Sequence, residues 1–214
     1  PSTNLHMALG LELDGTVGDA REEMMLAVRG GSFGVGMDKR SYLDMRINEA
    51  LVESPGVDLL AMGRPEGPGC YCYANNILKG YMDELSRNYP VVVADNEAGL
   101  EHLSRRTTQN VDFLFVISDA SARSIRSARR VKELVESLKL EVKKMYLVVT
   151  KVQAGNLEAL QGEIDDTGLE LIGAIPLDNH VVEYDLHSRP LVDLPDDAPA
   201  VVAVKEILKK AGIL

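Results

Sequence analysis

Short apolar runs alternate along this chain with longer stretches of helical periodicity, and this alternation constrains the fold more than any other feature. The runs are rich in valine, leucine and isoleucine, and they cover residues 57–62, 91–94, 113–117, 145–149 and 169–175. Continuous apolar runs of this length are typical of parallel strands that are buried on both faces. We therefore expect an α/β fold, with a mostly parallel sheet and helices on both of its faces.

Helices are predicted between the strands. The clearest covers residues 121–139, where apolar side chains from Ile125 to Leu138 recur on one face and Ser121 is a candidate N-cap. Others are predicted at 42–52, 75–88, 157–165 and 198–210. With 45% apolar residues in 23.4 kDa, and no repeat or long linker, we expect one domain over residues 1–214.

The charge balance is strongly acidic. The chain has 23 Lys and Arg against 33 Asp and Glu, a net charge of −10. This charge argues against nucleic acid as an electrostatic partner. Because the sequence shows no apolar run of transmembrane length and no signal peptide, we expect no membrane association and a cytoplasmic location.

Cys70 and Cys72 are the two cysteines of the chain, and they follow a Gly-Pro-Gly turn. The helical pattern after them predicts that they lie near a helix N-terminus, where unpaired N–H groups favour thiolates. Thiolates bind Ni(II) and Zn(II), but a closed site needs about four donors. We therefore expect a second copy of the chain to supply the other two thiolates across a two-fold axis.

Two other interpretations of these cysteines stay open. A Cys-x-Cys pair by itself is a weak signal, and the residues are sometimes incidental. A strained disulfide between them is conceivable, although a single close pair cannot staple a fold and nothing else indicates secretion.

Polar residues follow four of the predicted strands, at the edge where α/β proteins bind ligands. Asp95 ends the run 91–94 and is predicted to organise Mg²⁺, with Gly99 able to contact a γ-phosphate. Asp95 as a helix cap is the alternative. The run 113–117 is followed by a polar segment in which Ser121 is interpreted as an ordinary helix N-cap. Thr150-Lys151 and Pro176 to Asp178 are two strand ends that could flank a base.

The glycine-rich stretch 30–39 looks like a phosphate-binding loop but is interpreted as a flexible loop. Met37-Asp38 follows Gly36 where the pattern G-x-x-x-x-G-K-S/T requires Lys and then Ser or Thr. No predicted strand precedes it.

The segments 1–10, 62–72 and 95–103 together resemble the nickel-inserting accessory ATPases of carbon monoxide dehydrogenase and acetyl-CoA synthase. These belong to the MinD-like branch of P-loop ATPases. The resemblance implies that the Cys70/Cys72 pair binds nickel or zinc between two subunits, and that ATP binding drives dimerisation. It also implies that Asp95 serves Mg²⁺ and the attacking water, that Gly99 senses the γ-phosphate, and that Pro176 and Asp178 border the base.

The chain departs from that family in two places. Pro1 aligns with the end of an Asp-x-Asp-Pro motif, so the first strand, the phosphate-binding loop, the first helix and the second strand are expected to be missing from these 214 residues. The fold is therefore expected to be N-terminally incomplete. Thr150-Lys151 stands where relatives commonly place Asn-Arg, which changes the adenine contact there.

The resulting expectation is a metallochaperone that delivers nickel to apo carbon monoxide dehydrogenase or acetyl-CoA synthase from a homodimeric site. In the intact protein ATP would gate delivery, and the 214 residues alone are expected not to hydrolyse ATP. Two alternatives stay open: a metal-binding scaffold that works without nucleotide, and a partition or cell-positioning ATPase.

Overall fold

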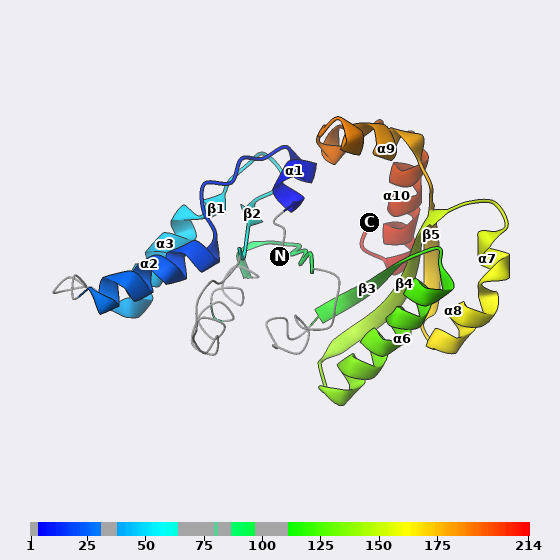
Figure 1. The fold of residues 1–214 in the computed structure, drawn as a ribbon, viewed down its shortest axis with the longest axis horizontal. Coiled ribbons are helices and arrows are strands. Elements are labelled where there is room, and N and C mark those ends of the chain that lie inside the picture. Colours follow the sequence, from blue (N-terminus) through cyan, green and yellow to red (C-terminus); the bar gives the residue numbers. More distant parts are fainter. Residues whose placement is uncertain (1–3, 31–37, 64–79, 81–86, 97–110) are drawn as a thin grey trace. The chain divides into compact units, whose positions relative to one another are not determined.

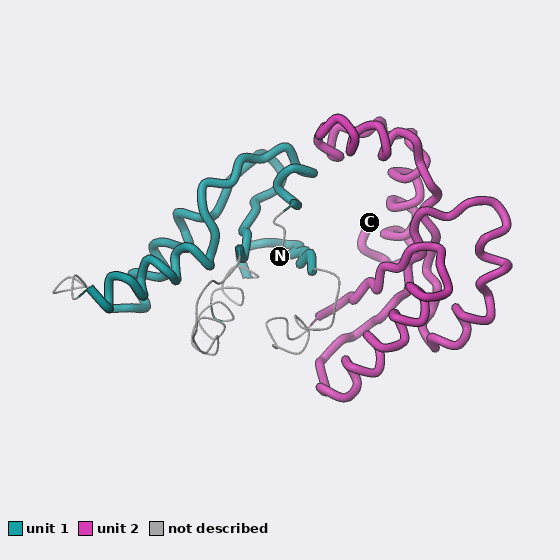
Figure 2. Tube along the Cα trace, in the orientation of Figure 1, with its two compact units in different colours: residues 1–97 teal, residues 98–214 magenta. Residues whose placement is uncertain are grey.

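The computed structural model describes all residues except 1–3, 31–37, 64–79, 81–86 and 97–110. The chain separates into two compact units, Pro1–Glu97 (unit 1) and Ala98–Leu214 (unit 2), which are coloured separately in Figure 2. Each unit is described by itself.

Unit 2 is built on a parallel sheet of three strands in the order β3-β4-β5 (Figure 1). The strands are β3 (Val111–Asp119), β4 (Val142–Val152) and β5 (Glu170–Pro176). The helices are α6 (Ala122–Ser137), α7 (Asn156–Ala159), α8 (Gln161–Thr167), α9 (Asn179–Leu186) and α10 (Pro199–Ala211), with a short 3-10 turn at Leu191–Asp193.

Both faces of this sheet are covered, because consecutive residues of β4 point to opposite sides. Leu147 and Val149 pack with Ile125 of α6 and Ile164 of α8. Tyr146 and Val148 pack on the other side, in a cluster that includes Ile207 of α10. This explains why residues 145–149 form an unbroken apolar run, and it confirms the predicted α/β fold.

Unit 1 contains α1 (Leu5–Leu9), α2 (Val17–Arg29), α3 (Lys39–Glu49) and two strands of two residues each, β1 (Leu51–Val52) and β2 (Leu59–Leu60). The strands pair antiparallel. A small core between α2 and α3 consists of buried residues from both helices: Val17, Ala20, Met24, Leu43 and Ile47.

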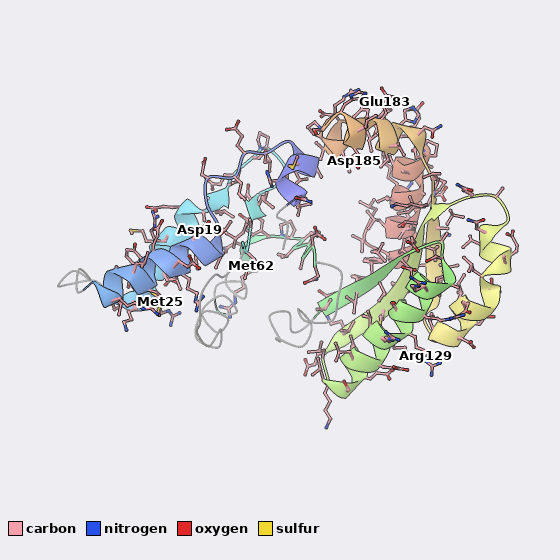
Figure 3. The ribbon with its side chains drawn as sticks, viewed as in Figure 1. Asp19, Met25, Met62, Arg129, Glu183 and Asp185 are labelled. Carbon is pink, nitrogen blue, oxygen red and sulfur yellow. The ribbon has the colours of Figure 1, made fainter. Side chains whose placement is uncertain are left out.

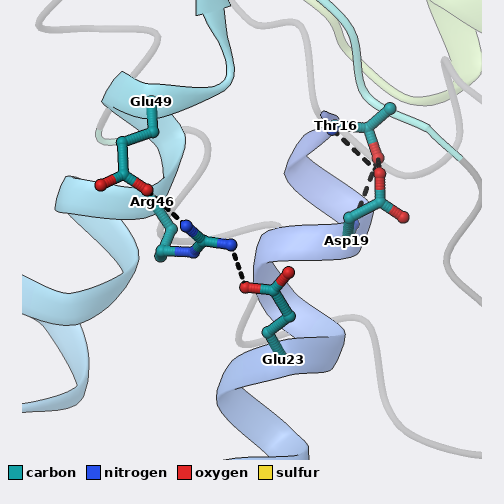
Figure 4. A network of polar contacts seen from close by, with 5 residues as sticks. All are labelled: Thr16, Asp19, Glu23, Arg46 and Glu49. Carbon is teal, nitrogen blue, oxygen red and sulfur yellow. Dashed lines mark hydrogen bonds and ion pairs between the residues drawn. The ribbon is translucent and has the colours of Figure 1, made fainter. Parts of the chain in front are cut away.

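Polar contacts at the ends and between the helices support this small core (Figure 4). The Asp19 N–H donates to Thr16 Oγ1 (3.1 Å) and the Thr16 N–H donates to Asp19 Oδ2 (3.0 Å), which forms a capping box at the start of α2. Arg46 of α3 pairs with both Glu23 of α2 and Glu49.

Two predicted strands in unit 1 are corrected by the structure. Residues 57–62 contribute only the two-residue strand β2, which pairs with β1 rather than in the parallel sheet. Residues 91–94 form no strand, and Val93 is 82% exposed. A strand needs hydrogen-bonded neighbours, and no described segment pairs with this run. Among the described strands, β3 pairs with β4 alone.

The predicted helices that fall within the described residues agree with the structure, except at their ends and in the interior of one of them. The helix predicted at 42–52 is α3, which begins and ends earlier because Leu51 and Val52 form β1. The helix predicted at 157–165 is divided between α7 and α8 at Leu160, whose φ of −103° is not helical. Most of the predicted helix 75–88, and residues 31–37 of the glycine-rich loop, lie outside the described residues.

Candidate functional site

The carboxyl ends of β3, β4 and β5 lie at one edge of the sheet in unit 2. Asp119 is paired in register with Thr150, and Val152 with Pro176. The Thr150 hydroxyl donates to the Ser118 carbonyl oxygen (3.2 Å), and the Leu177 N–H donates to the Val152 carbonyl oxygen (3.0 Å). The structure therefore brings together the two segments that were predicted to flank a base.

Lys151 has an unusual backbone at this edge. Its φ is +56°, in the left-handed region that costs a residue other than glycine about 1–2 kcal/mol. The pairing of β4 with β5 is irregular between Val149 and Val152, so Lys151 lies in a bulge of the ladder. Its side chain is exposed and has no ion-pair partner among the described residues. Its positive charge is thus free to meet an anionic or polar ligand.

Asp178 is buried, with a side chain only 2% exposed. Its Oδ2 accepts from the Ala200 N–H (2.9 Å) and its Oδ1 from the His180 N–H (2.9 Å) and from His180 Nδ1 (3.0 Å). The Ala200 N–H above all lowers the pKa of this carboxyl, so it is ionised at neutral pH. Asp178 caps α9 and joins it to the start of α10, which fixes the segment after β5. Its place beside a base stays a prediction.

Ser121 is the N-cap of α6, as its position predicted. Its Oγ accepts from the Ser124 N–H (3.3 Å) and donates to Asp119 Oδ1 (2.6 Å). The polar residues after β3 therefore serve to cap α6, and the interpretation of Ser121 as an ordinary N-cap is confirmed.

Asp95 belongs to unit 1 and lies in the exposed stretch 91–96. Its carboxylate has no hydrogen-bond partner among the described residues, so it is available to a cation or a water. The segment that carries it is tied to unit 1 through Tyr89, whose hydroxyl donates to Asp58. Gly99 lies outside the described residues, and the roles of Asp95 and Gly99 stay predictions.

Cys70 and Cys72 also lie outside the described residues, but the segment that leads to them is well defined. The Val17 N–H donates to the Ala61 carbonyl oxygen (3.0 Å), and the Gly18 N–H donates to that of Met62 (2.9 Å). Gly63 follows with a φ of +66°, and a Cβ placed there would lie 2.0 Å from Thr16 Oγ1. Only glycine fits this approach, so residues 61–63 are anchored to the start of α2.

Within the described residues, no three His, Cys, Asp or Glu side chains are close enough to hold a metal ion. None of the helices in that part of the chain has both the length and the apolar character needed to cross a membrane.

Two features of unit 2 were not predicted from the sequence. The hydrogen bond between Thr150 and Ser118 depends on strand register, which one-dimensional periodicity does not reveal. The other is a group of four arginines on α6 between residues 123 and 130. The sequence does contain a signal for this group, because four arginines so close together stand out in a chain with a net charge of −10.

Comparison with known proteins identifies relatives over nearly the whole chain, although no protein-family model matches it. The uncharacterized ATP-binding protein MJ0685 of Methanocaldococcus jannaschii is 46% identical over 210 residues, which cover 98% of this chain and 83% of that protein. The carbon monoxide dehydrogenase accessory protein CooC of Rhodospirillum rubrum is 27% identical over 169 residues, which cover 75% and 62%.

Solved structures agree on the fold. The MinD cell division protein of Aquifex aeolicus aligns with a TM-score of 0.66 at 21% identity, over 98% of this chain and 80% of that one. A ParA family ATPase of Chlorobium tepidum also gives a TM-score of 0.66, at 15% identity, over 99% and 80%. At 46% identity over nearly its whole length, the chain belongs to the same family as the ATP-binding protein MJ0685, and it has the fold of the MinD and ParA proteins.

Proposed function

We propose that this protein is a metallochaperone that carries Ni(II) to apo carbon monoxide dehydrogenase or acetyl-CoA synthase, with ATP gating delivery. The observation that carries the proposal is the Cys70/Cys72 pair in a chain similar to a carbon monoxide dehydrogenase accessory protein. Two thiolates from each of two chains would complete a four-donor site for nickel or zinc. The protein is therefore proposed to act as a homodimer.

Two groups of described residues support the nucleotide part of this proposal, and each is taken by itself. The unpartnered carboxylate of Asp95 suits the water shell of Mg²⁺, and ATP with Mg²⁺ would supply the phosphoryl chemistry that drives delivery. Pro176 and exposed Lys151 would border the base, and Asp178 would hold their segment through Ala200. Gly99 is proposed to contact the γ-phosphate.

Metal binding tests the proposal first. The purified protein should bind about one Ni(II) or Zn(II) per two chains, and either Cys70→Ser or Cys72→Ser should abolish binding, because each removes two of about four thiolates. His187→Gln is the matched control, since it removes an exposed imidazole and should leave the stoichiometry unchanged. Equal metal content in the double Cys70→Ser/Cys72→Ser variant would rule out the shared thiolate site.

Nucleotide coupling tests the gating. Metal should tighten the binding of a non-hydrolysable ATP analogue to the native protein, with a coupling of about 1–3 kcal/mol, and the analogue should tighten metal binding equally. Calorimetric titrations with and without Ni(II) measure both. Equal analogue affinities would mean that the two sites are independent and that ATP does not gate delivery.

A second candidate is a partition or cell-positioning ATPase, which the structural likeness to MinD and ParA proteins favours. This second function agrees with the fold, but it assigns no role to Cys70 and Cys72. The alternative of a nucleotide-independent metal scaffold predicts metal binding without coupling. The metal-binding measurement and the nucleotide titrations together therefore distinguish the three candidate functions.

A further inference from the structure

An arginine-rich face lies on α6. Between residues 111 and 214 the chain has five arginines, and four of them lie within the first nine residues of this helix: Arg123, Arg126, Arg129 and Arg130. The chain as a whole has a net charge of −10, so this helix opposes the charge of the whole protein. We call these four residues the α6 arginine face.

The arginine face points to solvent. Arg123, Arg126 and Arg130 are spaced by three and four residues, which places them on the same side of the helix. The opposite side packs on the sheet, because Ile125 is fully buried and Ala128 nearly so. All four arginines are exposed, and Figure 3 marks Arg129 on the helix.

Two of the four charges are neutralised within unit 2. Arg126 Nε donates to Glu163 of α8 (2.8 Å), and Arg129 Nε donates to Glu133 one turn along α6 (2.9 Å). The side chains of Arg123 and Arg130 have no polar partner among the described residues. Since they are seven residues apart, their Cα atoms are separated by about 10 Å along the helix.

The chemistry of this face suits carboxylates on another protein. A guanidinium group binds a carboxylate through two parallel hydrogen bonds, and arginine is enriched in protein interfaces. Glu133 and Glu163 border the arginines, so the positive strip is narrow. A nucleic acid or an anionic membrane would bring many charges against these carboxylates and against the net −10 charge. A short acidic segment is small enough to contact the arginines alone, without approaching the surrounding carboxylates.

We propose that the α6 arginine face docks an acidic segment of a partner protein, with Arg123 and Arg130 each pairing with a carboxylate. The proposal is independent of the metal cargo, since neither arginine lies in the segments assigned to metal or nucleotide. If docking were lost while nickel binding stayed normal, the proposed function would therefore stand. If nickel binding were absent while docking was seen, the docking proposal would stand.

A labelled glutamate-rich peptide is the probe, and fluorescence anisotropy measures its binding to the full-length protein at low ionic strength. The variant Arg123→Glu/Arg130→Glu should weaken binding at least about tenfold, because it places like charges opposite the peptide and breaks no internal ion pair. Added salt should weaken wild-type binding. Arg123→Gln/Arg130→Gln provides a milder variant, and circular dichroism shows whether each variant is folded.

Lys209→Glu/Lys210→Glu is the matched control. These two exposed lysines in the last turn of α10 also lack partners among the described residues, and the charge change is the same. Binding close to wild type is expected here. Equal weakening in both charge-reversed variants would overturn the proposal. So would tighter binding to duplex DNA or phosphatidylserine vesicles, or a homodimer that dissociates only in the arginine variant.

Discussion

In unit 2 the apolar strands β3, β4 and β5 are neighbours and are covered by helices on both faces. In unit 1 an equally apolar run at 91–94 pairs with no described strand and is exposed. The core of unit 1 lies between two helices and is bordered by a capping box and a partly exposed ion pair. The difference shows that apolar composition makes a strand only where another strand completes its hydrogen bonds. Stability in the two units should accordingly respond to different substitutions.

Removal of a core leucine from the sheet should have the largest effect. Leu147 is 0% exposed and lies in the central strand between packed layers, so Leu147→Ala leaves a cavity that cannot collapse and should cost about 4 kcal/mol of unfolding free energy. Leu43, 1% exposed, lies between two helices that can approach each other, so Leu43→Ala should cost about 2.5 kcal/mol. Urea denaturation measures both. Ile117→Ala, at an exposed position of β3, is the control, and equal costs at Leu43 and Leu147 would contradict the comparison.

Gly63→Ala should have the next largest effect. The new Cβ would collide with Thr16 Oγ1 and would also require a left-handed alanine, so loss of the cap and backbone strain together should cost about 2–3 kcal/mol. Hydrogen exchange should rise in the first turn of α2 while β4 is unchanged. Gly56→Ala shares the positive φ (+91°) but has no atom within 4 Å of the new Cβ, so it isolates the strain. Equal effects at positions 56 and 63 would show that the collision with Thr16 is absent.

Asp178→Asn should cost about 2 kcal/mol at neutral pH, because an amide replaces the buried carboxylate that accepts from Ala200 and His180. The pKa of Asp178 is lowered in the folded state, so its contribution is full above the unfolded pKa of about 4 and is lost as the pH falls through the lower folded pKa. The difference between wild type and variant should therefore shrink below about pH 4. Thermal melts across pH measure this. Asp185→Asn, at an exposed position of α9, is the control variant for the melts.

Glu23→Gln should have the smallest effect. It removes one of the two carboxylates that pair with Arg46 in unit 1, but the pair is partly exposed, so the cost should be about 0.5 kcal/mol and should fall with added salt. Urea denaturation at two salt concentrations measures it, with Glu12→Gln as the control. A loss as large as that of Asp178→Asn would mean that ion pairs rather than packing hold unit 1 together.

Much of unit 2 was predictable from the sequence. The runs 113–117, 145–149 and 169–175 are strands, and the helices predicted at 121–139 and 198–210 are α6 and α10. Less of unit 1 was predictable, because β1 lies inside the helix predicted at 42–52 and its pairing with β2 is not a local property. The candidate site was likewise predictable only in part. Strand ends located Pro176 and Asp178, but not the burial of Asp178 or the bulge at Lys151.

The sequence by itself determined the α/β class, the cap at Ser121 and the polar ends of β3, β4 and β5, because periodicity, capping and strand length act over a few neighbouring residues. Only the tertiary structure decided which apolar runs become strands, which carboxylate is enclosed and where only glycine fits. Strand pairing, burial and close approach depend on residues far apart in the chain, such as Asp178 with Ala200 and Gly63 with Thr16.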